Sequence, residues 1–214
     1  MPPTQTRRRT ATITDIGRQY CARVQNQLIY ARGAWWAWNG CVWERQADME
    51  QRREFWKLLE EFQEKDNQAP SLGKRHALDD YVRSRLYIPE TELDKYPDLV
   101  NLANGIFNLA DGNLYPHRSD YYLTTMLPFG FDPLARTNMW QMFLQTTFVK
   151  PRSTEFDPEL AEFVQEAMGY SLTTDSSHHV TFWCVGEGAN GKGVLFHALE
   201  QLGGSATMAL NVGR

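Results

Sequence analysis

Apolar residues recur every three or four positions in six stretches of the chain, which is the spacing of one buried helix face. In the second stretch, Phe55, Leu58 and Leu59 follow this spacing. In the fifth, Asp157 is a suitable N-cap and Pro158 a suitable first helical residue. The pattern predicts helices that begin at Thr14 or Asp15 and that span about 48–63, 75–87, 136–147, 158–168 and 195–202.

Two shorter stretches surround turn-forming pairs and predict β-hairpins. The first has strands near Ala34–Trp38 and Cys41–Arg45, joined by Asn39-Gly40. We expect a type I′ turn there, because Asn and Gly tolerate the positive φ angles that it requires. The second hairpin turns at Asp111-Gly112. The sequence that follows, DYYLTTMLPFGFDP, predicts another strand that leads into a loop.

A different pattern begins at Val180–Val185, where every residue is apolar or β-branched. Such a run predicts a strand covered on both faces. Gly186–Lys192 then spells G-x-x-x-x-G-K, and apolar residues return at helical spacing until Gly203-Gly204. The order of strand, glycine-rich loop and helix is the context in which this motif binds phosphate.

The loop has the residue types that a triphosphate requires. Its glycines let the backbone curl and turn its N–H groups inward. The N-terminus of the next helix favours an anion, and Lys192 adds a full positive charge. The alternative is a glycine-rich turn that binds nothing. We expect a nucleotide site made by Gly186, Glu187, Gly188, Ala189, Asn190, Gly191, Lys192 and Gly193, with Lys192 as the catalytic residue.

Position 193 departs from the motif. A Ser or Thr usually follows the lysine, and its hydroxyl coordinates Mg²⁺. Here the residue is Gly193, and Val194 and Leu195 offer no substitute. We therefore expect phosphate binding to survive this change, and the placement of Mg²⁺ to be weakened.

Composition and charge restrict where nucleic acid could bind. With 42% apolar and 22% charged residues the chain is typical of globular proteins. Its net charge of −4 means that DNA contact requires a local patch. The tryptophans near Trp36 and Trp38 either stack on bases or pack in the core. The densest basic cluster, a weak candidate for DNA binding with a solvated helix face as its alternative, contains Lys74, Arg75, Arg83 and Arg85.

The remaining chemistry is sparse. Three widely spaced cysteines, Cys21, Cys41 and Cys184, fit neither a disulfide framework nor a zinc site and favour a reducing, cytoplasmic location. No metal-ligand spacing occurs around His178-His179, so we predict no metal site built from the chain's own side chains. No run of about 18 apolar residues exists, which argues against a membrane span.

Four segments occur in an order that resembles phage and plasmid primase-helicases. They are LVNLANGIFNLADGNLYPH, LPFGFDPLA, FVQEAMGYSLT and GEGANGKG. In that family a poxvirus-type N-terminal module precedes a superfamily 3 helicase ATPase domain, and the likeness starts at about Leu28. Asn190 before Gly191-Lys192 is the form typical of this helicase superfamily.

The resemblance implies an ATPase that uses ATP and Mg²⁺, assembles as a homo-oligomeric ring and moves along single-stranded or forked DNA. Its implied organisation is a flexible tail (1–13), an α+β module of helices and two or more hairpins (14–172), and the start of an α/β P-loop ATPase domain (173–214).

Only 21 residues follow Gly193, and Glu200 is the one carboxylate among them. In such an ATPase, a strand with an acidic residue and an arginine finger come after the phosphate loop. The 21 residues after Gly193 do not contain them in that order. We therefore expect a helicase fragment, or a naturally truncated gene product, that is inactive by itself. The alternative function is a non-enzymatic DNA-binding or assembly adaptor with a vestigial P-loop.

Overall fold

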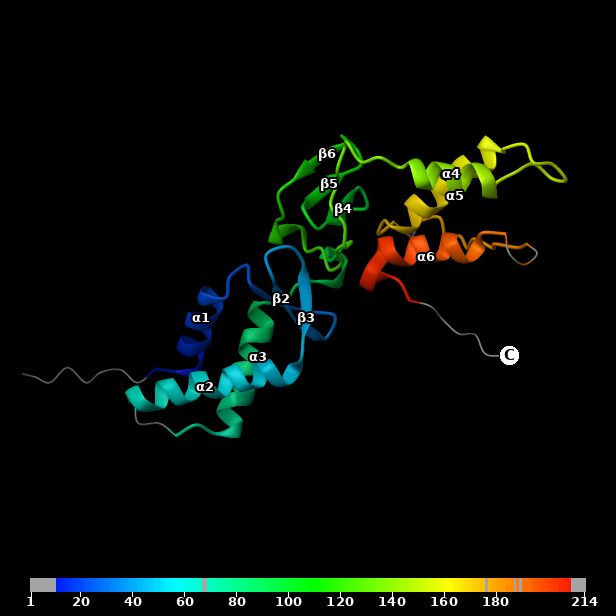
Figure 1. The fold of residues 1–214 in the computed structure, drawn as a ribbon. Coiled ribbons are helices and arrows are strands. Elements are labelled where there is room, and N and C mark those ends of the chain that lie inside the picture. Colours follow the sequence, from blue (N-terminus) through cyan, green and yellow to red (C-terminus); the bar gives the residue numbers. More distant parts are fainter. Residues whose placement is uncertain (1–10, 67–68, 176, 187, 189, 209–214) are drawn as a thin grey trace, which may run out of the picture. The chain divides into compact units, whose positions relative to one another are not determined.

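The computed structural model describes residues 11–66, 69–175, 177–186, 188 and 190–208 (Figure 1). Most of the tail expected at 1–13 lies outside these ranges. The chain divides into two compact units, Met1–Leu93 and Asp94–Arg214, and the division falls inside the module expected at 14–172. In the described ranges there are six α-helices and two three-stranded antiparallel sheets. None of these helices is both long and apolar enough to cross a membrane.

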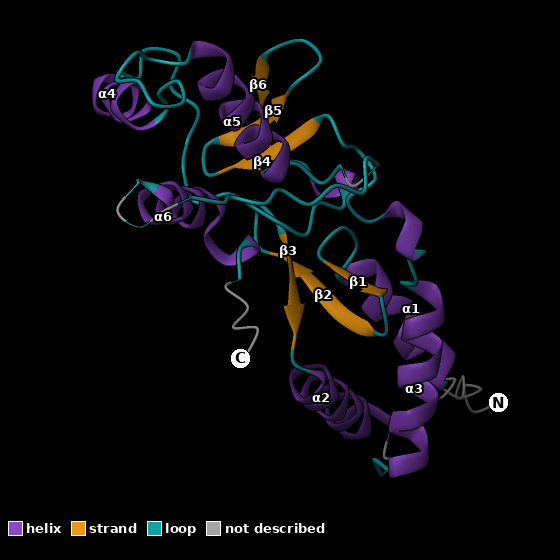
Figure 2. Cartoon of the chain, turned by 90° about the vertical axis from the view of Figure 1, so that its right-hand side faces the viewer, coloured by secondary structure: helices purple, strands orange, loops and turns teal. Residues whose placement is uncertain are grey.

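The first unit places three helices around one sheet of order β1-β2-β3 (Figures 1 and 2). Both strand pairs are antiparallel, with Trp36 opposite Ile29 and Arg45. The elements are α1 (Ile13–Arg23), β1 (Leu28–Ala31), β2 (Ala34–Trp38), β3 (Trp43–Gln46), α2 (Asp48–Asp66) and α3 (Leu72–Arg85), followed by a short 3-10 turn η1 (Glu90–Glu92).

Aromatic rings from three elements form the centre of this unit. The ring of Phe55 on α2 meets Trp35 on β2 at 6.0 Å and Tyr20 on α1 at 5.6 Å, both edge to face. Leu78 and Val82 of α3 are fully buried in the same cluster. Core packing is therefore confirmed for the hairpin tryptophan Trp35, which is 1% exposed.

Trp36 and Trp38 remain half-buried on β2. The indole Nε1 of Trp36 donates to the Ala31 carbonyl at 3.0 Å. The ring of Trp38 lies 5.7 Å from that of Trp43, which is buried. These contacts favour packing over base stacking for both side chains.

Arg83 joins its own helix, α3, to two other elements of the unit. Its guanidinium donates to Asp79 at 2.8 Å, to the hydroxyl of Tyr30 at 3.0 Å and to Asp48 at 3.3 Å. Its Cζ also lies 4.8 Å from the centre of the Tyr30 ring, a cation–π geometry. Because these partners come from β1, α2 and α3, the side chain fixes the helices against the sheet.

The turn expected at Asn39-Gly40 is wrong in type. The register pairs Trp38 with Trp43, so the connection has four residues, and of the expected pair only Gly40 has a positive φ, +103°. The Asn39 Oδ1 accepts from the amides of Cys41 and Val42 instead, at 2.9 Å each. The two-residue turn with positive φ at both positions lies between β1 and β2, at Arg32 and Gly33.

The second unit contains the sheet β4-β5-β6, three helices and two short 3-10 turns (Figures 1 and 2). The buried Asn101 of β4 supports the segment beside the sheet, because its Nδ2 donates to the Thr125 carbonyl at 3.2 Å. The elements are β4 (Leu99–Leu102), β5 (Gly105–Asn108), β6 (Asn113–Tyr115), η2 (Ser119–Tyr121), α4 (Asn138–Thr147), α5 (Pro158–Ser171), α6 (Lys192–Gly203) and η3 (Gly204–Ala206).

Helix periodicity locates the helices correctly but misplaces several ends. The N-cap of α1 is Thr12, not Thr14 or Asp15, and Asp15 closes a capping box with it. Helix α3 starts at Leu72 and not at about 75, because the Ser71 side chain caps it there. The cap of Asp157 on α5 is confirmed, although the helix continues past Gly169 to Ser171.

The strand predictions are partly wrong. The hairpin that turns at Asp111-Gly112 is present as β5 and β6, but β1 and β4 were not expected. The sequence after Asp120 forms no strand; Leu127 makes a single bridge to Leu102. Tyr122 there has a left-handed φ of +51°, which interrupts an extended chain.

Val180–Val185 is the clearest departure from the predicted fold. The segment forms no ladder with any part of the chain that the structure describes. Every residue of the segment is exposed, including the neighbours Phe182 (42%) and Trp183 (85%), which an extended chain points to opposite sides, so neither face is covered. An extended segment becomes a strand only when a neighbour accepts and donates its backbone hydrogen bonds, and here none is adjacent.

We expect Arg83→Ala to lower the free energy of unfolding by about 1–2 kcal/mol. The substitution leaves Asp79, which is nearly buried, without its charged partner, while partial exposure of Arg83 screens part of the effect. Urea unfolding followed by tryptophan fluorescence measures this. Arg85→Ala, an exposed change on the same helix, serves as the control and should stay within about 0.5 kcal/mol. Equal stability of both variants would contradict the role assigned to Arg83.

We also expect the amides of Val180–Val185 to exchange with solvent orders of magnitude faster than those of β2. They lack ladder partners among the described residues, whereas β2 is hydrogen-bonded on both edges. Hydrogen exchange resolved by mass spectrometry or NMR measures the difference. Strong protection of Val180–Val185 would show that another part of the chain, or another molecule, pairs with it.

Candidate functional site

The candidate phosphate loop, residues 186–193, ends at the N-terminus of α6. Gly191 is the N-cap and has a left-handed φ of +80°. Only glycine adopts this conformation without a steric cost, so the local sequence explains the sharp turn into the helix. The helix then runs to Gly203, and Gly204 ends it with a φ of +51°. The helix predicted after the glycine-rich loop is therefore confirmed.

The ammonium of Lys192 is turned back over the loop. Its Nζ donates to the carbonyl of Gly186 at 2.8 Å and to the side-chain Oδ1 of Asn190 at 2.6 Å. The lysine is half-buried, whereas Asn190 is exposed. These two contacts hold a full positive charge across the two ends of the loop.

The Asn190 side chain occupies the space beside Gly186. A Cβ atom placed on Gly186 would lie 2.2 Å from the Asn190 Nδ2 and 3.3 Å from the Lys192 Nζ. The first distance is shorter than any real contact, so a side chain at 186 would displace the amide. The motif's first glycine thus makes room for the side chain that contacts the lysine.

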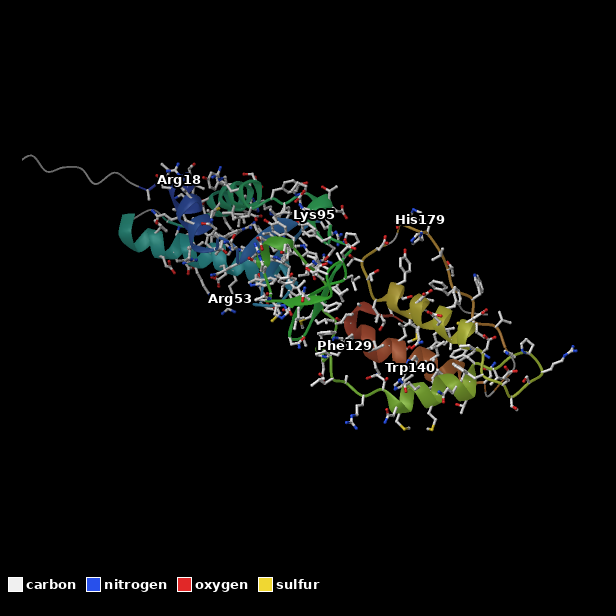
Figure 3. All side chains as sticks on the ribbon, turned by 90° about the horizontal axis from the view of Figure 1, so that it is seen from above. Arg18, Arg53, Lys95, Phe129, Trp140 and His179 are labelled. Atoms are coloured by element: carbon white, nitrogen blue, oxygen red, sulfur yellow. The ribbon has the colours of Figure 1, made fainter. Side chains whose placement is uncertain are left out.

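The loop also packs against α4. A Cβ on Gly191 would meet the Thr147 side chain at 2.7 Å and the Phe143 ring at 3.3 Å. Phe143 is itself stacked on Trp140, which Figure 3 labels on α4, with ring centres 5.3 Å apart. Sequence reasoning missed Thr147 and Phe143 as neighbours of the loop, because no motif relates α4 to residues more than 40 positions away.

Two of the predicted nucleotide-binding residues, Glu187 and Ala189, lie outside the described residues. Gly188 and Gly193 have no neighbouring atom where a side chain would begin, so both positions face open space. Within the described ranges, no three His, Cys, Asp or Glu side chains lie close enough together to hold a metal ion. An ammonium over a glycine loop at a helix N-terminus is chemically suited to a phosphate group.

The four basic residues predicted to contact DNA do not share one surface. Arg75 is 6% exposed, and Arg83 is held by Asp79, Asp48 and Tyr30. The Lys74 Nζ donates to the Ala69 carbonyl at 2.9 Å, and Arg85 is exposed.

Arg83 is also the member of this group with a shifted pKa. Burial lowers the pKa of Arg83, but the hydrogen bond and the charge of Asp79 raise it, and the net shift is upward. Carboxylates of the first unit therefore balance the positive charge of Arg83. The exposed Arg85 is better placed than Arg83 to contact a phosphate backbone.

The comparison with known families concerns the part of the chain before the loop. Residues 18–149 match the family model described as D5 N terminal like. No curated protein showed significant similarity to the chain. The match confirms the resemblance to the N-terminal module of primase-helicases over these residues, and it ends before the phosphate loop. The chain therefore belongs to the D5 N-terminal-like family, which is related to the primase-helicases of phages and viruses.

Proposed function

We propose that residues 186–193 bind the phosphates of ATP, in a protein that serves DNA replication through a D5-like module. The single observation that supports this proposal best is the position of the Lys192 ammonium, held over the loop that Gly191 turns into α6. A helix N-terminus and a lysine over a glycine-rich loop are two elements of a polyphosphate site.

The wider activity that we propose is the one implied by the resemblance to primase-helicases. In an intact primase-helicase the ATP site would drive movement along single-stranded or forked DNA, with subunits arranged in a ring. Mg²⁺ would accompany the nucleotide, although Gly193 supplies no hydroxyl to hold it. These assignments rest on the D5-like match at 18–149 and on the loop geometry together.

The alternative is a DNA-binding adaptor that makes no use of the loop. Of the four basic residues, the exposed Arg85 and the partly buried Lys74 support this alternative. Arg75 is buried, and Arg83 is bound to Asp79. Two measurements separate the functions: nucleotide binding and salt-sensitive binding to a single strand.

We expect the chain to bind ADP, and Lys192→Ala to weaken that binding at least tenfold. The variant removes the charge that faces the phosphates, an interaction of about 1.4 kcal/mol or more. Titration calorimetry with ADP measures the affinity. Gln201→Ala, an exposed change at the other end of α6, is the matched control and should bind ADP as the wild type does. Absence of ADP binding, or binding that survives Lys192→Ala, would refute the proposed site.

The adaptor is tested with the same proteins. Single-strand binding that falls with salt, persists in Lys192→Ala and weakens in Arg85→Ala would favour it.

We expect Gly193→Ser to make ATP binding depend on Mg²⁺. No atom lies within 4 Å of a Cβ at this position, so the serine fits, and its hydroxyl restores the usual metal ligand. The measurement is ATP affinity with Mg²⁺ and with EDTA. The ATP affinity with Mg²⁺ divided by that with EDTA should be near one in the wild type and about three or more in the variant. An equal effect of Mg²⁺ on both proteins would contradict the proposal that Gly193 lacks the hydroxyl that holds the metal.

A further inference from the structure

The geometry points to Asn190 as the positioning residue of the phosphate loop: its side chain holds the Lys192 ammonium in place before any anion arrives. This inference rests on the proposed function, because it concerns how the same loop prepares its charge. It adds a role for a residue whose side chain, unlike the backbone around it, has no part in cradling phosphate.

The evidence is a bridge across the loop. The amide oxygen of Asn190 accepts from the Lys192 Nζ at 2.6 Å, a short charge-assisted hydrogen bond. The same Nζ donates to the Gly186 carbonyl at 2.8 Å. One acceptor comes from each end of the loop, so together they fix the ammonium over it.

A second observation concerns Gly186. The Asn190 Nδ2 occupies the space that a side chain at 186 would need, at 2.2 Å from an ideal Cβ. Gly186 is not one of the glycines with a positive φ, so its backbone conformation does not require glycine. A larger residue at 186 would therefore have to displace the Asn190 amide, which couples these two positions.

Holding the lysine matters because its side chain is long and flexible. A free lysine loses rotamer freedom when it binds an anion, and that loss weakens affinity. A lysine already restrained by Asn190 has lost most of this freedom beforehand. We expect Asn190→Ala to weaken ADP binding about three- to tenfold, the effect of releasing one rotamer-rich side chain.

The experiment combines ADP titration with NMR of the lysine side-chain ammonium in the full chain, without nucleotide. In the wild type the Lys192 ammonium is hydrogen-bonded, so its proton exchange should be slow enough to give a signal, assigned by its loss in Lys192→Ala. Asn190→Ala should lose or broaden this signal. Asn190→Asp keeps an acceptor oxygen at the same place, so the signal should persist while ADP binding weakens through the added negative charge.

Gly186→Ala gives a further arm, because it should displace Asn190 and weaken ADP binding by a similar factor. In the double variant with Asn190→Ala, the obstructing amide is gone, so the two effects should not add. Gln201→Ala is again the control for both measurements.

Each outcome has a defined consequence. An ammonium signal and an ADP affinity that are unchanged in Asn190→Ala would overturn the role of Asn190 and leave the nucleotide site standing. Loss of the signal in Asn190→Asp, or fully additive effects of the two loop substitutions, would also overturn it. A wild-type chain that binds no ADP would overturn the proposed function itself, whatever the ammonium signal shows.

Discussion

The candidate site depends on one residue without a side chain, Gly191. Its left-handed backbone turns the loop into α6, and its missing Cβ lets the loop approach Thr147 of α4. Any other residue would have both a strained φ and a clash at 2.7 Å. The helix N-terminus and the lysine beside it are directed toward the loop only because this turn is possible.

A different constraint organises the first unit. Arg83 places its charge among Asp79, Asp48 and Tyr30, and so connects two helices to the edge of the sheet. A buried or half-buried cation is stable only with such partners. The consequence for function is that this unit uses its best-placed guanidinium for its own structure, which leaves less basic surface for nucleic acid than the sequence suggests.

The sequence predicted the helices of this chain better than its strands. Helix periodicity located all six helices, and the turn-forming pairs at 39–40 and 111–112 located two hairpins. Strands β1 and β4 were missed because the two-residue connections that follow them, Arg32-Gly33 and Ala103-Asn104, are not the Asn-Gly or Asp-Gly pairs that located the other strands. The apolar run Val180–Val185 has the composition of a buried strand, but composition cannot supply the neighbour that a strand needs.

By itself, the sequence identified the residues of the proposed phosphate loop, since the glycine spacing and the lysine lie at neighbouring positions. Only the tertiary structure decided which charges are exposed and which are matched. Arg83 and Arg85 look alike in the sequence, yet the partners of Arg83 lie as far as 53 positions away. The same holds for Gly191 and Thr147. Local patterns record preferences over one or two turns, whereas contacts between distant segments arise only when the whole unit packs.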